Sequence, residues 1–148
     1  VRTLAEEWVR QSQRQGVLVQ LDSSGCAVRF DVEHLRRILV NLLDNAARYA
    51  GDRDGSIQVA TRQGANGRAV LQVWSGGAPL GPAVQRHLFE PFFSSESRSS
   101  GLGLFICREL CERHGASIGY ERRALGDSGP EGNEFYVVFA PAERRISQ

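Results

Sequence analysis

Two asparagines lie four residues apart inside a segment whose apolar pattern predicts a long α-helix. At roughly 100° per residue, Asn41 and Asn45 fall on one line that borders the apolar face. Asparagine is a poor mid-helix residue because its side chain competes for backbone hydrogen bonds, so the pair has two interpretations. The first is a solvated face that tolerates two amides. The second is a set of neutral oxygen ligands for Mg²⁺, which shares its shell with water and phosphate oxygens; Arg48, one turn later, would then meet phosphate charge.

The stretch 73–105 has glycine clusters on both sides of an aromatic motif. Residues 75–77 read Ser-Gly-Gly, residues 89–93 read "FEPFF", and residues 101–104 read Gly-Leu-Gly-Leu. Glycine allows close backbone approach, and a helix that starts at such a cluster points free N–H groups at an anion. This layout suits a loop that closes over a phosphate chain. The alternative is an ordinary Gly/Pro surface loop followed by a mobile Ser-rich loop.

Periodicity predicts the elements that position these residues. Asp31 is a good N-cap for the longest helix, expected over 31–50 and ending at Gly51. Its apolar residues form one packed face: Leu35, Ile38, Leu39, Leu42, Leu43 and Ala46. Other helices are expected over 2–15, 82–88 and 103–114, and strands over 17–21, 26–30, 56–63, 68–74, 116–123 and 134–140, with a hairpin turn at 65–67.

This order of elements predicts an α+β fold, a two-layer α/β sandwich in which helices cover one face of a mixed sheet. The 148 residues suit a single domain over 1–148, without internal repeat or interdomain linker. Aromatic side chains are expected to pack: Phe89, Phe92 and Phe93 as anchors of the loop, and Trp8, Trp74 and Tyr120 in the core or at its edge.

Composition restricts the setting of the protein. The net charge of +1 gives no field that favours nucleic acid or an anionic membrane. No apolar run reaches membrane-spanning length and the start of the chain has no signal-peptide core, so any membrane tether is expected outside this segment. Three cysteines without metal-type spacing indicate reduced thiols. A reducing, cytoplasmic setting is therefore expected; the family resemblance described below further implies that the domain belongs to a membrane-tethered sensor.

The segment "LRRILVNLLDNAARYA" (35–50) resembles the N box of the sensor histidine kinase catalytic domain. "FEPFF" resembles the family's F box, "GLGL" its second glycine box, and residues 75–79 stand where its first glycine box is expected. All four boxes occur in order, and the similarity covers essentially the whole chain. The chain thus resembles the superfamily that shares the Bergerat ATP-binding fold with gyrase, heat-shock chaperones and mismatch-repair ATPases. "GLGLFICRELCERHGA" is similar to the nitrogen- and pilus-regulating branch.

The resemblance implies a protein-histidine kinase of a two-component system, which transfers the γ-phosphoryl group of Mg·ATP. It implies Asn45 as the Mg²⁺ ligand, with Asn41 orienting the metal or a water and Arg48 meeting phosphate. Asn41 stands where the superfamily's ATPases place a water-activating Glu, and an amide cannot accept a proton as a carboxylate does. Negligible ATP hydrolysis is therefore expected. The rest of the nucleotide-binding set is Ser75, Gly77, Arg98, Gly101, Leu102, Gly103 and Leu104.

The first glycine box departs from the family pattern Asp-x-Gly-x-Gly, because Ser75 replaces the Asp and Pro79 the last Gly. The family's carboxylate accepts from the adenine amino group. Ser75 accepts without charge assistance, which roughly halves the bond strength. Losing the charged acceptor costs on the order of 1–3 kcal/mol, or roughly tenfold to a hundredfold in affinity. We therefore expect weak nucleotide binding, with a dissociation constant between roughly 10 µM and 1 mM.

The phosphoacceptor is expected outside this chain. His34, His87 and His114 are followed by Leu, Leu and Gly and not by the acidic residue of the family's histidine box. The implied partners are the dimerisation and phosphoacceptor domain of the same kinase and a response regulator.

Two other functions compete with the kinase. The altered first glycine box favours a degenerate, non-catalytic Bergerat-fold module that acts by protein–protein contact. A Bergerat-fold ATPase is disfavoured by Asn41.

Overall fold

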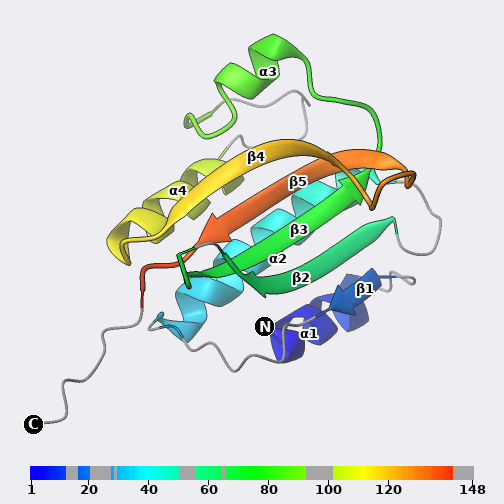
Figure 1. Cartoon of the computed structure of the whole chain (residues 1–148). Helices are drawn as coiled ribbons and strands as arrows, with labels where there is room; N and C mark the ends of the chain where they lie inside the picture. Colours follow the sequence, from blue (N-terminus) through cyan, green and yellow to red (C-terminus); the bar gives the residue numbers. More distant parts are fainter. Residues whose placement is uncertain are drawn as a thin grey trace, which may run out of the picture.

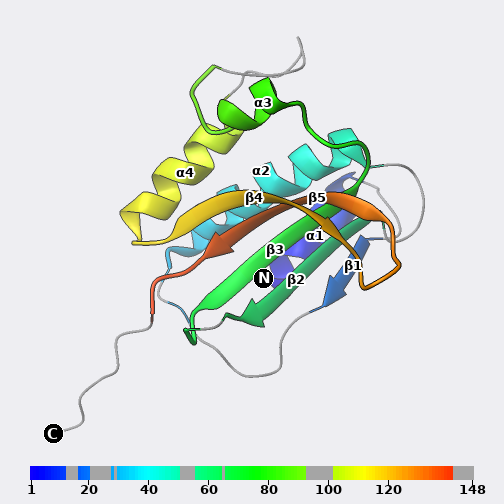
Figure 2. The ribbon, with the colours of Figure 1, turned by 45° about the horizontal axis from the view of Figure 1, so that its top comes forward.

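The computed structural model describes residues 1–12, 17–20, 28, 30–50, 56–64, 66–92 and 102–141. Its elements in chain order are α1 (Arg2–Ser12), β1 (Val17–Gln20), α2 (Val32–Tyr49), β2 (Ile57–Gln63), β3 (Ala69–Gly76), α3 (Pro82–Arg86), α4 (Gly103–Arg113), β4 (Ser117–Ala124) and β5 (Glu131–Val138). Figures 1 and 2 show α1, α2 and α4 on the same side of the sheet.

The sheet has five strands in the order β1-β2-β3-β5-β4. β1 runs parallel to β2, whereas every other neighbouring pair is antiparallel. The expected α+β sandwich with helices on one face of a mixed sheet is therefore confirmed. Of the strand expected over 26–30, only Val28 and Phe30 are described, and neither lies in a strand. β1 instead takes the edge position beside β2.

Helix α2 is the centre of the helical layer. The carboxylate of Asp31 caps it by accepting a hydrogen bond from the backbone N–H of His34 at 3.0 Å. Four side chains of its apolar face are fully buried: Ile38, Leu39, Leu42 and Leu43. Leu35, on the same face, is half-buried and packs against the same core. Since burying such a side chain contributes roughly 1.5–3 kcal/mol, this face fixes the position of α2 on the sheet, as predicted.

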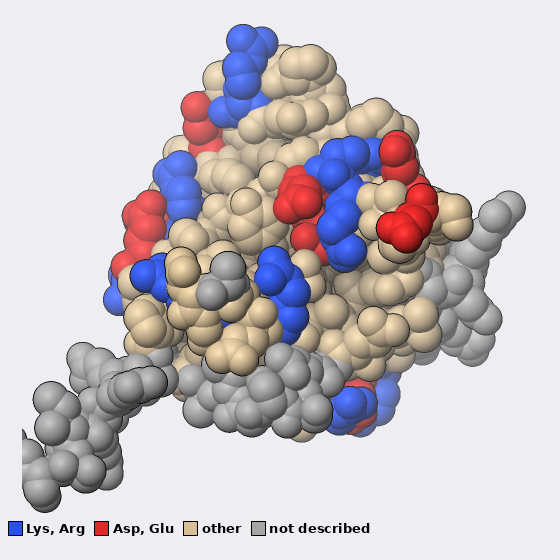
Figure 3. All heavy atoms as spheres, in the orientation of Figure 1, with Lys and Arg blue, Asp and Glu red and all other residues tan. Residues whose placement is uncertain are grey.

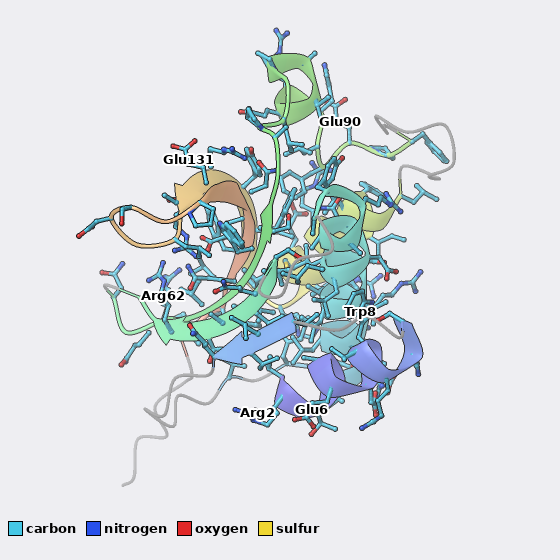
Figure 4. The ribbon with its side chains drawn as sticks, turned by 90° about the vertical axis from the view of Figure 1, so that its right-hand side faces the viewer. Arg2, Glu6, Trp8, Arg62, Glu90 and Glu131 are labelled. Carbon is cyan, nitrogen blue, oxygen red and sulfur yellow. The ribbon has the colours of Figure 1, made fainter. Side chains whose placement is uncertain are left out.

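Helix α1 packs against α2 through Leu4, Ala5 and Trp8. The indole N–H of Trp8 donates to Asp44 Oδ1 at 2.8 Å, and Figure 4 shows Trp8 lying between the two helices. This bond turns the Asp44 carboxylate toward α1, so it lies away from the line of polar residues on α2.

The face of the sheet opposite the helices also buries the aromatic residue Trp74. Because side chains alternate along a strand, Trp74 points to the face opposite to that of its neighbour Val73. Its ring lies against Gly132, where an added Cβ atom would collide with the ring. Its indole N–H donates to the carbonyl of Arg123 at 3.0 Å. Trp74 is thus buried as expected, but beneath the β4–β5 hairpin and outside the main core. Figure 3 shows that arginines and acidic residues gather around this hairpin.

The remaining differences concern the ends of elements. α1 ends at Ser12 among the described residues, and α2 at Tyr49 with Ala50 as its C-cap. The β2–β3 turn contains Gly67 at φ 73°, which glycine adopts without strain. Among the described residues, no helix is long and apolar enough to cross a membrane.

Candidate nucleotide site

Asn41, Asn45 and Arg48 form a line of polar residues along α2, and the side-chain amide nitrogen of Asn45 has no hydrogen-bond partner among the described residues. Asn45 is 9% exposed. Asn41 is half-buried one turn earlier, and Arg48 is exposed in the last turn. A buried amide without a hydrogen bond is costly, and such groups in native proteins commonly face a ligand or ion. Asn45 therefore marks the C-terminal half of α2 as a candidate site.

The start of α4 meets this line. The side-chain amide of Asn41 donates to the carbonyl of Gly103 at 3.3 Å, across 62 positions of sequence. A Cβ atom on Gly103 would lie 3.8 Å from Asn41 Cγ, which is ordinary contact, so glycine here is not required by the Asn41 contact. The first turn of α4 has N–H groups without intrahelical partners. The predicted N box and second glycine box therefore lie side by side.

The first glycine box lies beside the C-terminal end of α2. Ser75 is 3% exposed near the end of β3, between Ile57 of β2 and Asn133 of β5. Gly77 has φ 141°, and a Cβ atom there would lie 2.6 Å from the carbonyl oxygen of Tyr49. Only glycine fits this close approach to the last residue of α2. The box expected from sequence is thus packed against the end of the N box.

Side chains from three elements bind the carbonyls of the loop that follows β3. Arg122 Nη1 donates to the Gly77 carbonyl at 2.6 Å, and Asn133 Nδ2 donates to the Ala78 carbonyl at 3.0 Å. Gln85 Nε2 donates to the carbonyl of Leu80 at 2.8 Å.

These three donors were not predicted from the sequence. The sequence could have indicated Asn133, because alternate residues of a strand share one face and Asn133 therefore lies on the same face of β5 as the buried Phe135 and Val137. It is a polar residue at a core-facing position. The contacts of Arg122 and Gln85 had no local signal.

The F box is only partly an anchor. Leu88 is buried, and the ring of Phe89 meets that of Phe135 edge-on at a centroid distance of 6.4 Å. Phe92, in contrast, is 78% exposed and has φ 64°, a left-handed conformation that bulky residues rarely adopt. The expectation that Phe92 packs is therefore wrong. Phe93, Arg98 and Gly101 lie outside the described residues.

The second glycine box contains two leucines, Leu102 and Leu104, which lie at the start of α4. Leu104 is half-buried and packs against the core, while Leu102 is the half-buried N-cap residue of α4. Both lie beside Gly103, so the described part of this box brings backbone, and no charged side chain, to the site.

The two cysteines that the structure describes, Cys107 and Cys111, are buried thiols. Burial raises the pKa of the Cys107 thiol to about 12, and its sulfur donates to the carbonyl of Ile38 at 3.8 Å. Burial likewise raises the pKa of Cys111 to about 11. Because both thiols stay protonated at neutral pH, neither is a nucleophile or a thiolate ligand.

In the described ranges, no group of three or more His, Cys, Asp or Glu could hold a metal ion. An amide oxygen such as that of Asn45 is the type of ligand that the described site offers.

Comparison with known proteins identifies the family. The family model of the histidine kinase-, DNA gyrase B-, and HSP90-like ATPase matches residues 30–144. The chain is 36% identical over 125 residues to the sensor protein kinase PilS of Pseudomonas aeruginosa, covering 82% of this chain and 23% of that protein. It is 39% identical over 104 residues to the C4-dicarboxylate transport sensor protein DctB of Rhizobium meliloti, covering 70% and 16%. The chain therefore spans less than a quarter of these relatives.

Solved structures agree with this result. The mycobacterial sensor histidine kinase MprB superposes with a TM-score of 0.75 at 26% identity, covering 93% of this chain and 91% of that chain. The catalytic domain of the histidine kinase ThkA superposes with a TM-score of 0.74 at 27% identity, covering 95% and 87%. The chain belongs to the histidine kinase-, DNA gyrase B- and HSP90-like ATPase family, as a catalytic domain of the sensor histidine kinase type.

Proposed function

We propose that this domain binds Mg·ATP and passes its γ-phosphoryl group to a histidine on a separate dimerisation domain. The observation that carries the proposal is the buried amide of Asn45, which lacks a partner and lies on the helix that Gly103 and Gly77 approach. The relatives named as sensor kinases support the reaction class.

Asn45 fits a Mg²⁺ ligand. The two ends of an asparagine amide are assigned from their hydrogen bonds, and here Nδ2 has none among the described residues. Turning the amide by 180° therefore brings Oδ1 to the same place without breaking a described bond. When bound, Mg²⁺ neutralises charge on the β- and γ-phosphates. A neutral amide that leaves most of the shell to water and phosphate suits this ion.

The phosphate half of the proposed site consists of the start of α4 and two arginines, Arg48 and Arg98. The first turn of α4, beginning at Gly103, directs backbone N–H groups toward an anion. Arg48 lies on the same line of α2 as Asn41 and Asn45 and would meet phosphate charge. Arg98 and Gly101 complete this set from sequence. Catalysis in such transfer is mostly positioning and charge neutralisation, which these groups supply.

Asn41 directs the reaction away from water. Its amide is bonded to the Gly103 carbonyl and has no basic lone pair with which to take a proton from water. The domain would therefore hold ATP without hydrolysing it until a histidine is presented.

The base half of the site is weaker. Ser75 and Gly77 would face the adenine, and the hydroxyl of Ser75 is the acceptor where the family has a carboxylate. Binding with a dissociation constant of roughly 10 µM to 1 mM follows from this loss.

We propose that residues 1–148 form one cytoplasmic catalytic domain of a two-component system. Its partners would be a dimerisation and phosphoacceptor domain and a response regulator. The resemblance of residues 101–116 to the nitrogen- and pilus-regulating branch supports membership of that branch. A second candidate, a non-catalytic module acting by protein contact, is favoured by Ser75 and Pro79.

Phosphotransfer in the complete protein that carries this domain separates the two candidates. With radiolabelled ATP, the kinase should accumulate acid-labile phosphohistidine, and Asn45→Ala should abolish the label. Asn66→Ala, which removes an exposed amide in the β2–β3 turn, is the matched control and should retain it. A wild-type protein that stays unlabelled would favour the non-catalytic module.

A further inference from the structure

The helix-facing side of the sheet changes character at the end that carries the first glycine box. One row across β2, β3, β5 and β4 is apolar and aromatic: Val59, Val73, Phe135 and Tyr120. The next row toward the glycine box reads Ile57, Ser75, Asn133 and Arg122. Three neighbouring polar residues therefore lie at the base of the loop that follows β3.

Asn133 is held in one orientation. It is 1% exposed, and its Oδ1 accepts from the hydroxyl of Tyr120 at 2.7 Å and from Arg122 Nη1 at 3.3 Å. A guanidinium only donates, so the oxygen must face Arg122. The amide nitrogen is thereby directed at the Ala78 carbonyl, 3.0 Å away.

Arg122 connects the same loop to the hairpin. Its side chain is 28% exposed, and its Nη1 is shared between the Gly77 carbonyl at 2.6 Å and Asn133. The adjacent Arg123 points to the other face of the sheet, where it pairs with the buried Glu134 at 2.6 Å. Figure 4 shows Glu131, the 3.8 Å ion-pair partner of Arg122, at the curled end of this hairpin. Arg122 and Arg123 therefore make their contacts on opposite faces of the sheet.

The loop is fixed from both ends. Arg122 and Asn133 hold the carbonyls of Gly77 and Ala78, while the buried side chain of Leu80 and the Gln85 bond hold its other end. Pro79 between them has a fixed φ. A loop already ordered in this way loses little conformational entropy when a ligand binds.

We propose that Arg122 and Asn133 form a clamp that holds the first glycine box ready for the nucleotide base and offsets part of the affinity lost with the family's carboxylate. Both are positioning residues, acting through Gly77 and Ala78. The clamp rests on the proposed function, because it presupposes that the loop meets the base of a nucleotide.

The test compares a ligand that has a base with one that has none. Calorimetry of the chain with Mg·ATP and with Mg·tripolyphosphate reports the base and phosphate halves separately. Arg122→Ala should weaken ATP about tenfold, because ligand binding must then order a loop residue that the clamp held in place, and leave tripolyphosphate within about twofold. Arg122→Lys keeps the charge and one donor and should recover part of the ATP affinity.

Arg123→Ala is the matched control, since it breaks an ion pair in the same hairpin on the other face. It should lower the melting temperature without changing the ratio of ATP to tripolyphosphate affinity. Hydrogen exchange over residues 77–81 should accelerate in Arg122→Ala and stay at the wild-type rate in Arg123→Ala.

The outcomes separate the two proposals. If the wild type binds both ligands and Arg122→Ala keeps the wild-type affinity ratio, or Arg123→Ala changes it equally, the clamp is wrong and the proposed function stands. If the wild type binds neither ligand, the proposed function fails and the clamp fails with it.

Discussion

Replacing Ser75 with aspartate should restore a charged acceptor to the base half of the site. Ser75 is almost fully buried in the strand that ends at the first glycine box, so a carboxylate there would meet the adenine amino group with little screening. A charged acceptor for one donor is worth on the order of 1–3 kcal/mol, which corresponds to roughly tenfold to a hundredfold tighter ATP binding. GTP presents a carbonyl at the same ring position, so it should gain nothing.

The assay is calorimetry with Mg·ATP and Mg·GTP on the wild type, Ser75→Asp and Ser75→Asn. The asparagine variant matches aspartate in size and lacks its charge, so it should leave both affinities near the wild-type values. Without nucleotide, Ser75→Asp should melt at a lower temperature, because it buries a charge that Arg122, two strands away in the same row, only partly offsets. Equal gains for Ser75→Asp and Ser75→Asn, or no gain in either, would refute the reasoning.

Leu42→Ala should destabilise the domain by about 2–5 kcal/mol, whereas Val32→Ala, at an exposed position of the same helix, should change the free energy of unfolding by less than about 0.5 kcal/mol in urea titrations. Because the pKa of Cys107 is about 12, its thiol should resist alkylation at pH 8 in the native state and react more as pH rises toward that value; mass spectrometry that finds rapid native labelling would contradict this. The isolated domain should release negligible phosphate from saturating ATP, since Asn41 is not a base; several turnovers per second that Asn45→Ala abolishes would make it an ATPase.

The fold followed from sequence where the determining interactions are local. The apolar repeat of α2 and its Asp31 cap define the helix whatever surrounds it, and the apolar side chains predicted for its packed face do pack against the core. The parallel pairing of β1 with β2 could not be predicted in the same way, because it joins strands on either side of α2. Trp74 was assigned to the core or its edge because it is large and apolar, yet the hairpin that covers it comes from residues about 50 positions later.

The candidate site shows the same division. Box order and spacing predicted that Asn41, Gly77 and Gly103 belong to one site, and the contacts of Asn41 and Gly77 bring the three boxes together. Asn133 and Arg122 were missed because their roles arise from register between β3, β5 and β4. Phe92 was misassigned because aromaticity alone does not reveal a left-handed backbone at the end of a loop.

Titration of the purified domain with ATP, with and without Mg²⁺, tests the central claim most directly. The wild type should bind Mg·ATP with a dissociation constant between roughly 10 µM and 1 mM and bind more weakly when EDTA removes the metal. Asn45→Ala should weaken Mg·ATP by about tenfold or more and lose that dependence on the metal, while the control Asn66→Ala should match the wild type. No heat with millimolar Mg·ATP, or an affinity that neither EDTA nor Asn45→Ala changes, would contradict the assignment of a Mg·ATP site at Asn45.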